Sequence, residues 1–161
     1  MKLATKILLL AVGIMLAACS KEPETLSTRE AQAIHAGEEC HLCGMFIKKF
    51  PGPKGELYLK TSDKIKKFCS TRDMFTFLLD PEYKKQVKEA YVHDMSKAHW
   101  KTPDDNHFID ARKAWYVIGS SKKGAMGKTL ASFGTQQQAQ DFMTEFGGKV
   151  YSFDQITLQI L

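Results

Sequence analysis

The side chains best suited to chemistry lie in segment 40–45, which reads Cys-His-Leu-Cys-Gly-Met. Two thiols three positions apart can approach one ion, and Gly44 lets the backbone turn tightly behind them. The thioether of Met45 adds a third soft donor. Sulfur ligands favour Cu(I), and the segment holds none of the carboxylates that calcium or magnesium would need. The pattern therefore predicts a Cu(I) site that uses Cys40, Cys43 and Met45.

A fourth soft donor lies far along the chain, in the segment Gly124-Ala125-Met126-Gly127. Methionine usually fills gaps in a hydrophobic core, but Met126 has no apolar neighbours in sequence. An exposed thioether binds Cu(I) and is easily displaced. We expect Cys43 and Met126 to meet around one ion, with Cys40, Met45 or a histidine completing the site.

The sequence leaves open whether histidines also bind the metal and whether the cysteines serve another purpose. His35, His41 and His93 are possible additional metal ligands, although a lone histidine is more often solvated. With His35 and His41, the two cysteines could instead hold a structural Zn(II). A thioredoxin-like redox pair is a further alternative, but it would require a helix directly after the cysteines. A c-type haem is excluded, because glycine follows the second cysteine.

The N-terminus predicts export and lipidation. Two lysines precede an uncharged apolar run over 7–18, which is too short for an ordinary membrane span and is typical of a secretory signal. The run ends in Leu-Ala-Ala before Cys19, which resembles a bacterial lipobox. We expect residues 1–18 to be removed and Cys19 to carry lipid on the periplasmic side of the envelope. Ser20 favours the outer membrane by resemblance to the sorting rule of such lipoproteins.

Lipidation of Cys19 leaves three cysteines, at positions 40, 43 and 69. An odd number in an oxidising compartment cannot be explained by disulfides alone. A soft-metal site that occupies the thiolates is an alternative. Cys69 follows Phe68 and precedes a helix start, and we interpret it as a buried structural thiol.

Composition excludes several functions. The formal net charge is +5, and the lysines are dispersed without interleaved aromatic residues, so no nucleic-acid partner is expected. We find no Ser-His-Asp arrangement, phosphate loop or dinucleotide fingerprint. The chain is therefore expected to be a binding protein and not an enzyme.

The elements that would position these residues repeat in order. Strands are expected over 56–60, 66–69 and 88–93, with a helix capped by Ser70. Strands over 114–119, 129–133 and 149–153, with a helix over 136–146, give the same order again. The fold class is therefore α+β, with two tandem ββαβ units packed together. The expected division is a signal peptide at 1–18, a tether at 19–37, a first unit at 38–95, a linker at 96–113 and a second unit at 114–161.

These motifs together resemble the NosL family. The matching segments are Cys40-x-x-Cys-Gly-Met45, Asp73-Met-Phe-x-Phe77, Ile109-Asp-Ala-x-x-Ala-x-Tyr-Val117-x-Gly-Ser120, Gly124-x-Met126-Gly127 and Gly147-Gly-x-Val150, all after a lipobox. The resemblance covers nearly all of the chain after the tether. This chain has Gly-Ala-Met-Gly where the family pattern leads us to expect Gly-Pro-Met-Gly.

The resemblance implies a copper chaperone lipoprotein that serves nitrous oxide reductase beside a membrane transporter complex. It also implies a fold related to the organomercurial lyase MerB. A thiol oxidoreductase, or a MerB-like lyase using Cys40 and Cys43 as nucleophiles, is the enzymatic alternative.

Overall fold

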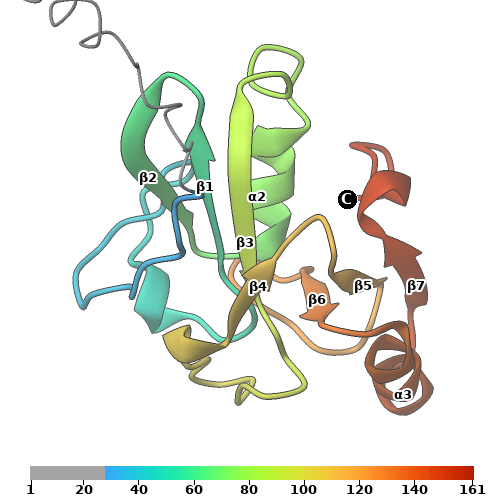
Figure 1. The fold of residues 1–161 in the computed structure, drawn as a ribbon. Coiled ribbons are helices and arrows are strands. Elements are labelled where there is room, and N and C mark those ends of the chain that lie inside the picture. Colours follow the sequence, from blue (N-terminus) through green and yellow to red (C-terminus); the bar gives the residue numbers. More distant parts are fainter. Residues whose placement is uncertain (1–27) are drawn as a thin grey trace, which may run out of the picture.

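The computed structural model describes residues 28–161, and their first half forms a four-stranded antiparallel sheet in the order β2-β1-β3-β4 (Figure 1). The cleavage site and Cys19 lie outside the described residues. The elements of this half are β1 (Gly55–Leu59), β2 (Ser62–Phe68), α2 (Thr71–Leu78), β3 (Val87–His93) and β4 (Phe108–Asp110), with 3₁₀ turns at Ile47–Lys49 and Asp105–His107.

The second half forms a three-stranded antiparallel sheet in the order β6-β5-β7. Its elements are β5 (Trp115–Ile118), β6 (Leu130–Phe133), α3 (Gln136–Phe146), β7 (Lys149–Ser152) and a 3₁₀ turn at Phe153–Gln155. Thr135 caps α3 through a full capping box, and the chain leaves the helix at Gly147 with φ +74°.

Both halves use one connection scheme, which confirms the α+β fold with tandem ββαβ units. In each half the first strand is central and pairs antiparallel with the second and third, as β1 does with β2 and β3, and β5 with β6 and β7. Each helix follows the second strand after a two-residue step, and Ser70 and Thr135 both accept a hydrogen bond from the backbone at the third helical residue.

A shared core joins the two halves. Phe75 on α2 meets Tyr116 on β5 edge to face, with ring centroids 5.0 Å apart. Thr71 donates to the carbonyl of Leu130 on β6 at 2.5 Å. A smaller cluster around Phe133 and Ala139 lies between α3 and the second sheet. Because neither sheet covers both of its faces alone, the two units bury them together.

Two expected boundaries differ from the structure. The segment assigned to the tether reaches the first sheet at Arg29, and Ile34 is buried in the core. Part of the expected linker forms β4, which pairs with β3. Each of these segments gains its structure from contacts with distant residues.

Within residues 28–161, no helix has the length and apolar character needed to cross a membrane.

Candidate metal centre

The first part of the site is a tight turn that carries Cys40 and Cys43. The amide of Cys40 donates to the carbonyl of Met45 at 2.8 Å, and the amide of Gly44 donates to the carbonyl of Cys40 at 2.9 Å. Gly44 adopts φ +73°, a conformation in which a side chain would be strained. The turn is fixed to β2 by the amide of His41, which donates to the carbonyl of Lys67 at 2.8 Å.

The second part is the junction between β2 and α2, which carries Cys69 and Asp73. Cys69 directly follows the last residue of β2, and Ser70 caps the helix by accepting the amide proton of Asp73 at 3.0 Å. This bond holds Asp73 in the first helical turn, on the same side as Cys69. The cap therefore sets the geometry of both residues.

These two parts form one cluster of four donors. The ligand atoms of Cys40, Cys43, Cys69 and Asp73 all lie within 4.8 Å of one another. The Sγ atoms of Cys43 and Cys69 are 3.5 Å apart. Asp73 Oδ2 lies 3.1 Å from Cys69 Sγ and 3.6 Å from Cys40 Sγ. One ion placed among these atoms could bind several of them without a change in the fold.

Exposure differs sharply within the cluster. Cys40 and Cys69 are 3% and 0% exposed, whereas Cys43 lies at the surface. Met45 is partly buried beside the core. A metal ion bound here would therefore contact buried donors on its protein side and would be accessible to solvent at Cys43.

The cluster favours one thiolate before any metal binds. A hydrogen bond with Cys69 outweighs burial and lowers the pKa of the Cys40 thiol to about 5. The same pairing, together with burial and Asp73, raises the pKa of Cys69 well above its usual range. Partial desolvation also raises the pKa of Cys43. A metal that uses Cys43 or Cys69 must therefore displace a proton.

A buried lysine offsets part of this negative charge. Lys54 is 3% exposed, and its Nζ atom donates to the carbonyls of Phe50, Pro51 and Cys69 at 2.7, 3.2 and 3.1 Å. Burial lowers the pKa of Lys54 to about 8, while the neighbouring cysteine cluster and Asp105 oppose that change. The ammonium group is thus held directly under the cysteine cluster.

Met126 occupies a strained turn on a separate loop. The amides and carbonyls of Gly124 and Gly127 pair across the turn at 2.9 and 3.2 Å, which leaves Ala125 and Met126 at its tip. Met126 adopts φ +58°, the sole positive φ among the described non-glycine residues, and its side chain is 67% exposed. Ala125 is buried and belongs to the hydrophobic cluster that contains Cys40 and Cys69.

The three candidate histidines have different surroundings. His35 is exposed. His41 packs edge-on against Phe77, and its Nε2 atom lies 2.9 Å from the Lys66 ammonium. Burial, followed by the charge of Lys66, lowers the pKa of His41. His41 could turn toward a metal at Cys43, since it lies in the same tight turn.

His93 has no ring nitrogen available for a metal. It is fully buried, its Nδ1 atom accepts the amide proton of Lys54 at 3.1 Å, and its Nε2 atom lies 3.2 Å from Asp105. Burial lowers the pKa of His93 against the opposing effect of Asp105. The expectation that His93 could complete the site is therefore withdrawn, and its role is structural.

Two donors in the cluster were missed by sequence reasoning. Cys69 is buried, as expected, but it lies against Cys43 and not in a purely apolar environment. Asp73 appeared only as the first residue of a segment that matches the family pattern, and not as a metal ligand. The odd cysteine and the acid four positions later are the signal that could have identified them.

Comparisons with known proteins agree with one another. A family model described as NosL matches residues 31–161. A copper-binding lipoprotein NosL of Stutzerimonas stutzeri is 45% identical over 153 residues, which is 95% of this chain and 78% of the relative. A protein of the same name from Achromobacter cycloclastes is 35% identical over 73% of this chain and 62% of its own length.

Two solved structures are similar as well. The crystal structure of the copper chaperone NosL from Shewanella denitrificans is 61% identical, with a TM-score of 0.81 over 83% of this chain and 99% of that one. The solution structure of apo-NosL from Achromobacter cycloclastes is 31% identical, with a TM-score of 0.51 over 66% and 86% of the two chains. The family match and these relatives show that this chain belongs to the NosL family.

Proposed function

We propose that this chain binds Cu(I) in the cell envelope and delivers it for maturation of nitrous oxide reductase. The observation that carries the proposal is the cluster of Cys40, Cys43, Cys69 and Asp73, in which three sulfur atoms and a carboxylate lie within 4.8 Å and one thiol is exposed. Sulfur donors select Cu(I) over harder divalent ions. Relatives named copper-binding lipoprotein and copper chaperone support the same cargo.

The proposed transfer proceeds by exchange of ligands. Cys43 and Met126 are exposed, while Cys40 and Cys69 are buried. In this proposal Met126 and Met45 are the weak thioether ligands, and an acceptor protein replaces the thioether first. Cys43 would leave next, and the buried thiols would release the ion last. The order follows from accessibility and from the weaker bond of a neutral sulfur.

The proposed location is the periplasmic side of the envelope, with lipid on Cys19. One acyl chain alone gives only marginal membrane binding, so firm anchoring would need several chains or a second attraction. The proposed partners are nitrous oxide reductase and the membrane transporter complex that works with it. Anchoring would keep the metal centre near the membrane where copper is handed over.

The test is Cu(I) stoichiometry combined with X-ray absorption of the loaded protein. We expect one tightly bound Cu(I) per chain, with sulfur dominating the coordination sphere. Cys43→Ala should weaken binding by more than the ~10–100-fold loss typical of residues that only support a ligand. Leu42→Ala is the matched control, because it removes an exposed neighbour without a donor. Cu(I) binding that is unchanged in Cys43→Ala would refute the proposal.

The 3.5 Å separation of Cys43 and Cys69 favours one alternative, a thiol oxidoreductase. Such an enzyme, or a lyase related to MerB, would turn over a substrate at the thiols and would not depend on Met126. Turnover that survives Met126→Gly but not Cys43→Ala would favour the enzyme. Cu(I) affinity that falls in both variants would favour the chaperone.

A structural zinc site is the other alternative, because three thiolates and a carboxylate also suit tetrahedral Zn(II). If zinc held the fold together, its removal should unfold the domain. We expect the metal-free protein to stay folded, because the core shared by the two sheets does not include the exposed thiol.

A further inference from the structure

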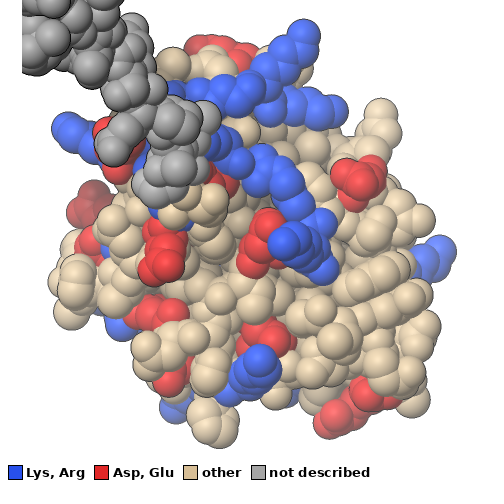
Figure 2. All heavy atoms as spheres, viewed as in Figure 1, with Lys and Arg blue, Asp and Glu red and all other residues tan. Residues whose placement is uncertain are grey.

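Basic side chains gather at one end of the first sheet. The turn between β1 and β2 lies beside the segment that precedes β3, because the amide of Lys60 donates to the carbonyl of Gln86 at 2.8 Å. Figure 2 shows Lys and Arg side chains gathered over the corresponding upper end of this face. We define the basic end by its members: Lys60, Lys64, Lys84, Lys85, Lys88 and Arg112.

Most of these cations have no acidic partner in the part of the chain that the structure describes. Within residues 28–161, five members of the basic end form no ion pair, and only Lys88 does, with Glu89 at 3.2 Å. The acids Asp63 and Glu89 both bind Arg29, at 3.1 and 2.7 Å. The other acids of this end, among the described residues, are Glu30, Asp80, Glu82 and Asp110. In the described part of the chain, unpaired basic groups therefore exceed unpaired acids at this end.

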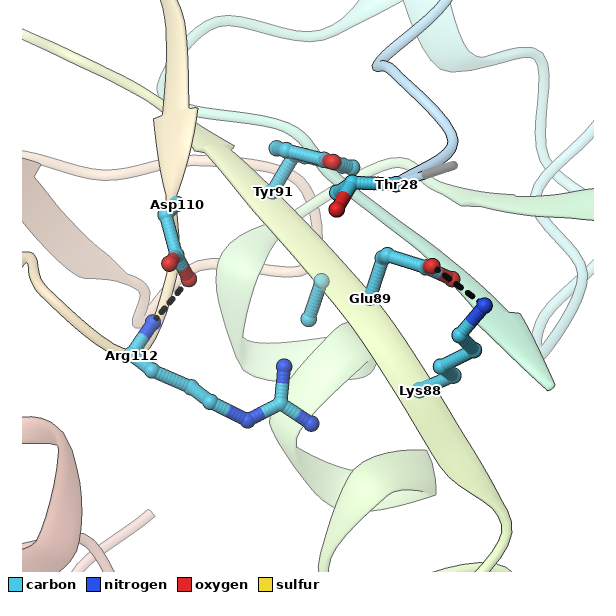
Figure 3. A pocket seen from close by; sticks show the side chains of 7 residues that line it. Thr28, Lys88, Glu89, Tyr91, Asp110 and Arg112 are labelled. Carbon is cyan, nitrogen blue, oxygen red and sulfur yellow. Dashed lines mark hydrogen bonds and ion pairs between the residues drawn. The ribbon is translucent and has the colours of Figure 1, made fainter. Parts of the chain in front are cut away.

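The described chain begins at this end, beside a pocket of about 390 Å³. The polar side chains that line the pocket are those of Thr28, Lys88, Glu89, Tyr91, Asp110 and Arg112. Figure 3 shows the Arg112 side chain extending from beside β4 toward β3. The only hydrogen bond that the Arg112 guanidinium makes to a described residue is with the carbonyl of Val87 at 3.4 Å. An exposed and weakly bound guanidinium is well suited to a phosphate group.

The metal centre lies at the other end of the same strands. Strand β2 begins at Ser62, next to the basic end, and ends at Phe68, directly before Cys69. Seven residues of extended strand span ~20 Å. A surface that holds the basic end would therefore lie about the length of β2 away from the cysteine cluster.

We propose that the basic end docks on anionic phospholipid headgroups and orients the metal centre away from the membrane. This inference rests on the proposed lipid at Cys19, which lies only nine positions before Thr28 and so holds this end close to the bilayer. A basic surface beside a lipid anchor is the second attraction that stable membrane binding requires. The contact is electrostatic and should weaken as salt increases.

The experiment is amide hydrogen exchange of the full lipidated chain on two kinds of vesicle. One is phosphatidylethanolamine with phosphatidylglycerol, and the other is neutral phosphatidylcholine alone. We expect exchange over 59–64 and 82–88 to slow several-fold on the anionic vesicles and not on the neutral ones. High salt should remove the difference. Equal exchange on both vesicles would overturn the proposal.

Charge reversal supplies the matched comparison. Lys84→Glu with Lys85→Glu should abolish the protection, while Lys101→Glu with Lys149→Glu, two exposed lysines outside the basic end, should preserve it. Protection that persists in the first variant would also overturn the proposal. Cu(I) titration of the same samples separates the two ideas. If the protein does not bind Cu(I) but its amides are still protected on anionic vesicles, the proposed function is refuted and the proposed docking surface stands.

Discussion

At the scale of single residues, Cys69 decides how many thiols the site offers. It lies 3.5 Å from Cys43 and 3.1 Å from Asp73, yet it is fully buried. We predict that Cys69→Ser lowers Cu(I) affinity and removes one sulfur from the coordination sphere seen by X-ray absorption. Serine keeps the size and the hydrogen bond to Asp73, so thermal unfolding should change little.

A purely structural role for Cys69 would give a different result. If Cys69→Ser lowers the free energy of unfolding but leaves the copper–sulfur count unchanged, Cys69 is the structural thiol that its sequence context predicts. Leu78→Ala serves as the control for a purely structural loss, because Leu78 is a buried residue of α2 and not a donor.

Met126 permits a test that separates its thioether from its backbone. A left-handed φ of +58° costs a side-chain-bearing residue ~1–2 kcal/mol, and at the third position of a tight turn glycine is the usual solution. We predict that Met126→Gly leaves the free energy of unfolding within ~1 kcal/mol, because relief of strain offsets the added freedom of the unfolded chain.

The same Met126→Gly variant should bind Cu(I) more weakly if the thioether is a ligand. Competition with a chromophoric Cu(I) chelator measures the change, and chemical denaturation measures stability. Unchanged affinity would contradict the proposed ligand. Strain kept at an exposed methionine is itself a reason to look for function there.

The predictable part of the site is the part encoded by local spacing. Cys40 and Cys43 lie in one turn, so their proximity follows from the sequence around Gly44. Cys69 is 26 positions from Cys43, and the pairing of the turn with β2 brings them together. That pairing cannot be seen in a single sequence. The burial of His93 between Lys54 and Asp105 is likewise a property of the tertiary fold.

At the scale of elements, the internal repeat provides a matched pair of helix caps. Ser70 caps α2 and Thr135 caps α3 with the same bond to the third helical amide. Replacing either by alanine should cost ~0.5–2 kcal/mol of stability. Only Ser70→Ala should also weaken Cu(I) binding, because the bond it loses holds Asp73 beside Cys69. Equal copper affinity in Ser70→Ala and Thr135→Ala would show that the cap does not support the site.

Helices and central strands could be predicted because they carry local signals. The caps, the glycines after α3 and the alternating strands all appear in the sequence, and the helix expected over 136–146 forms there. Strand β4 has only three residues and forms by pairing with β3. The segment around Arg29 is held by the carbonyls of Ser62 and Leu59 and by Glu89, none of which is near in sequence. Segments such as these become ordered only when the strands that they contact have already paired.

At the scale of the whole molecule, the length of the first sheet separates the basic end from the cysteine cluster. The described chain begins at the basic end, the cysteine cluster lies at the opposite end, and the second sheet packs against α2 between them.

The buried carboxylate of Glu56 lies on β1, the central strand of the first sheet. Its Oε2 atom accepts the amide proton of Gln32 at 2.9 Å, and its Oε1 atom has no hydrogen-bond partner among the described residues.

Glu56 makes the stability of the whole fold depend on pH. Burial raises its pKa from 4.5 to about 7, against the opposing effects of Gln32 and Lys67. Below pH 4.5 both the folded and the unfolded chain carry the proton, so the contribution of Glu56 is fully present. Between pH 4.5 and 7 only the folded chain keeps it, and the free energy of unfolding falls as pH rises, by ~3 kcal/mol in total.

The test compares Glu56→Gln with the unaltered chain across that range. His41 and His93 have lowered pKa values and act in the opposite direction, so the difference between the two proteins is the quantity to measure. Chemical denaturation at pH 4.5 and pH 7.5 should show Glu56→Gln gaining stability relative to the unaltered chain as pH rises. Glu145→Gln, on the exposed face of α3, should follow the unaltered chain at both values. A constant difference between Glu56→Gln and the unaltered chain would mean that Glu56 stays charged inside the fold, with Lys67 at 4.0 Å as its partner.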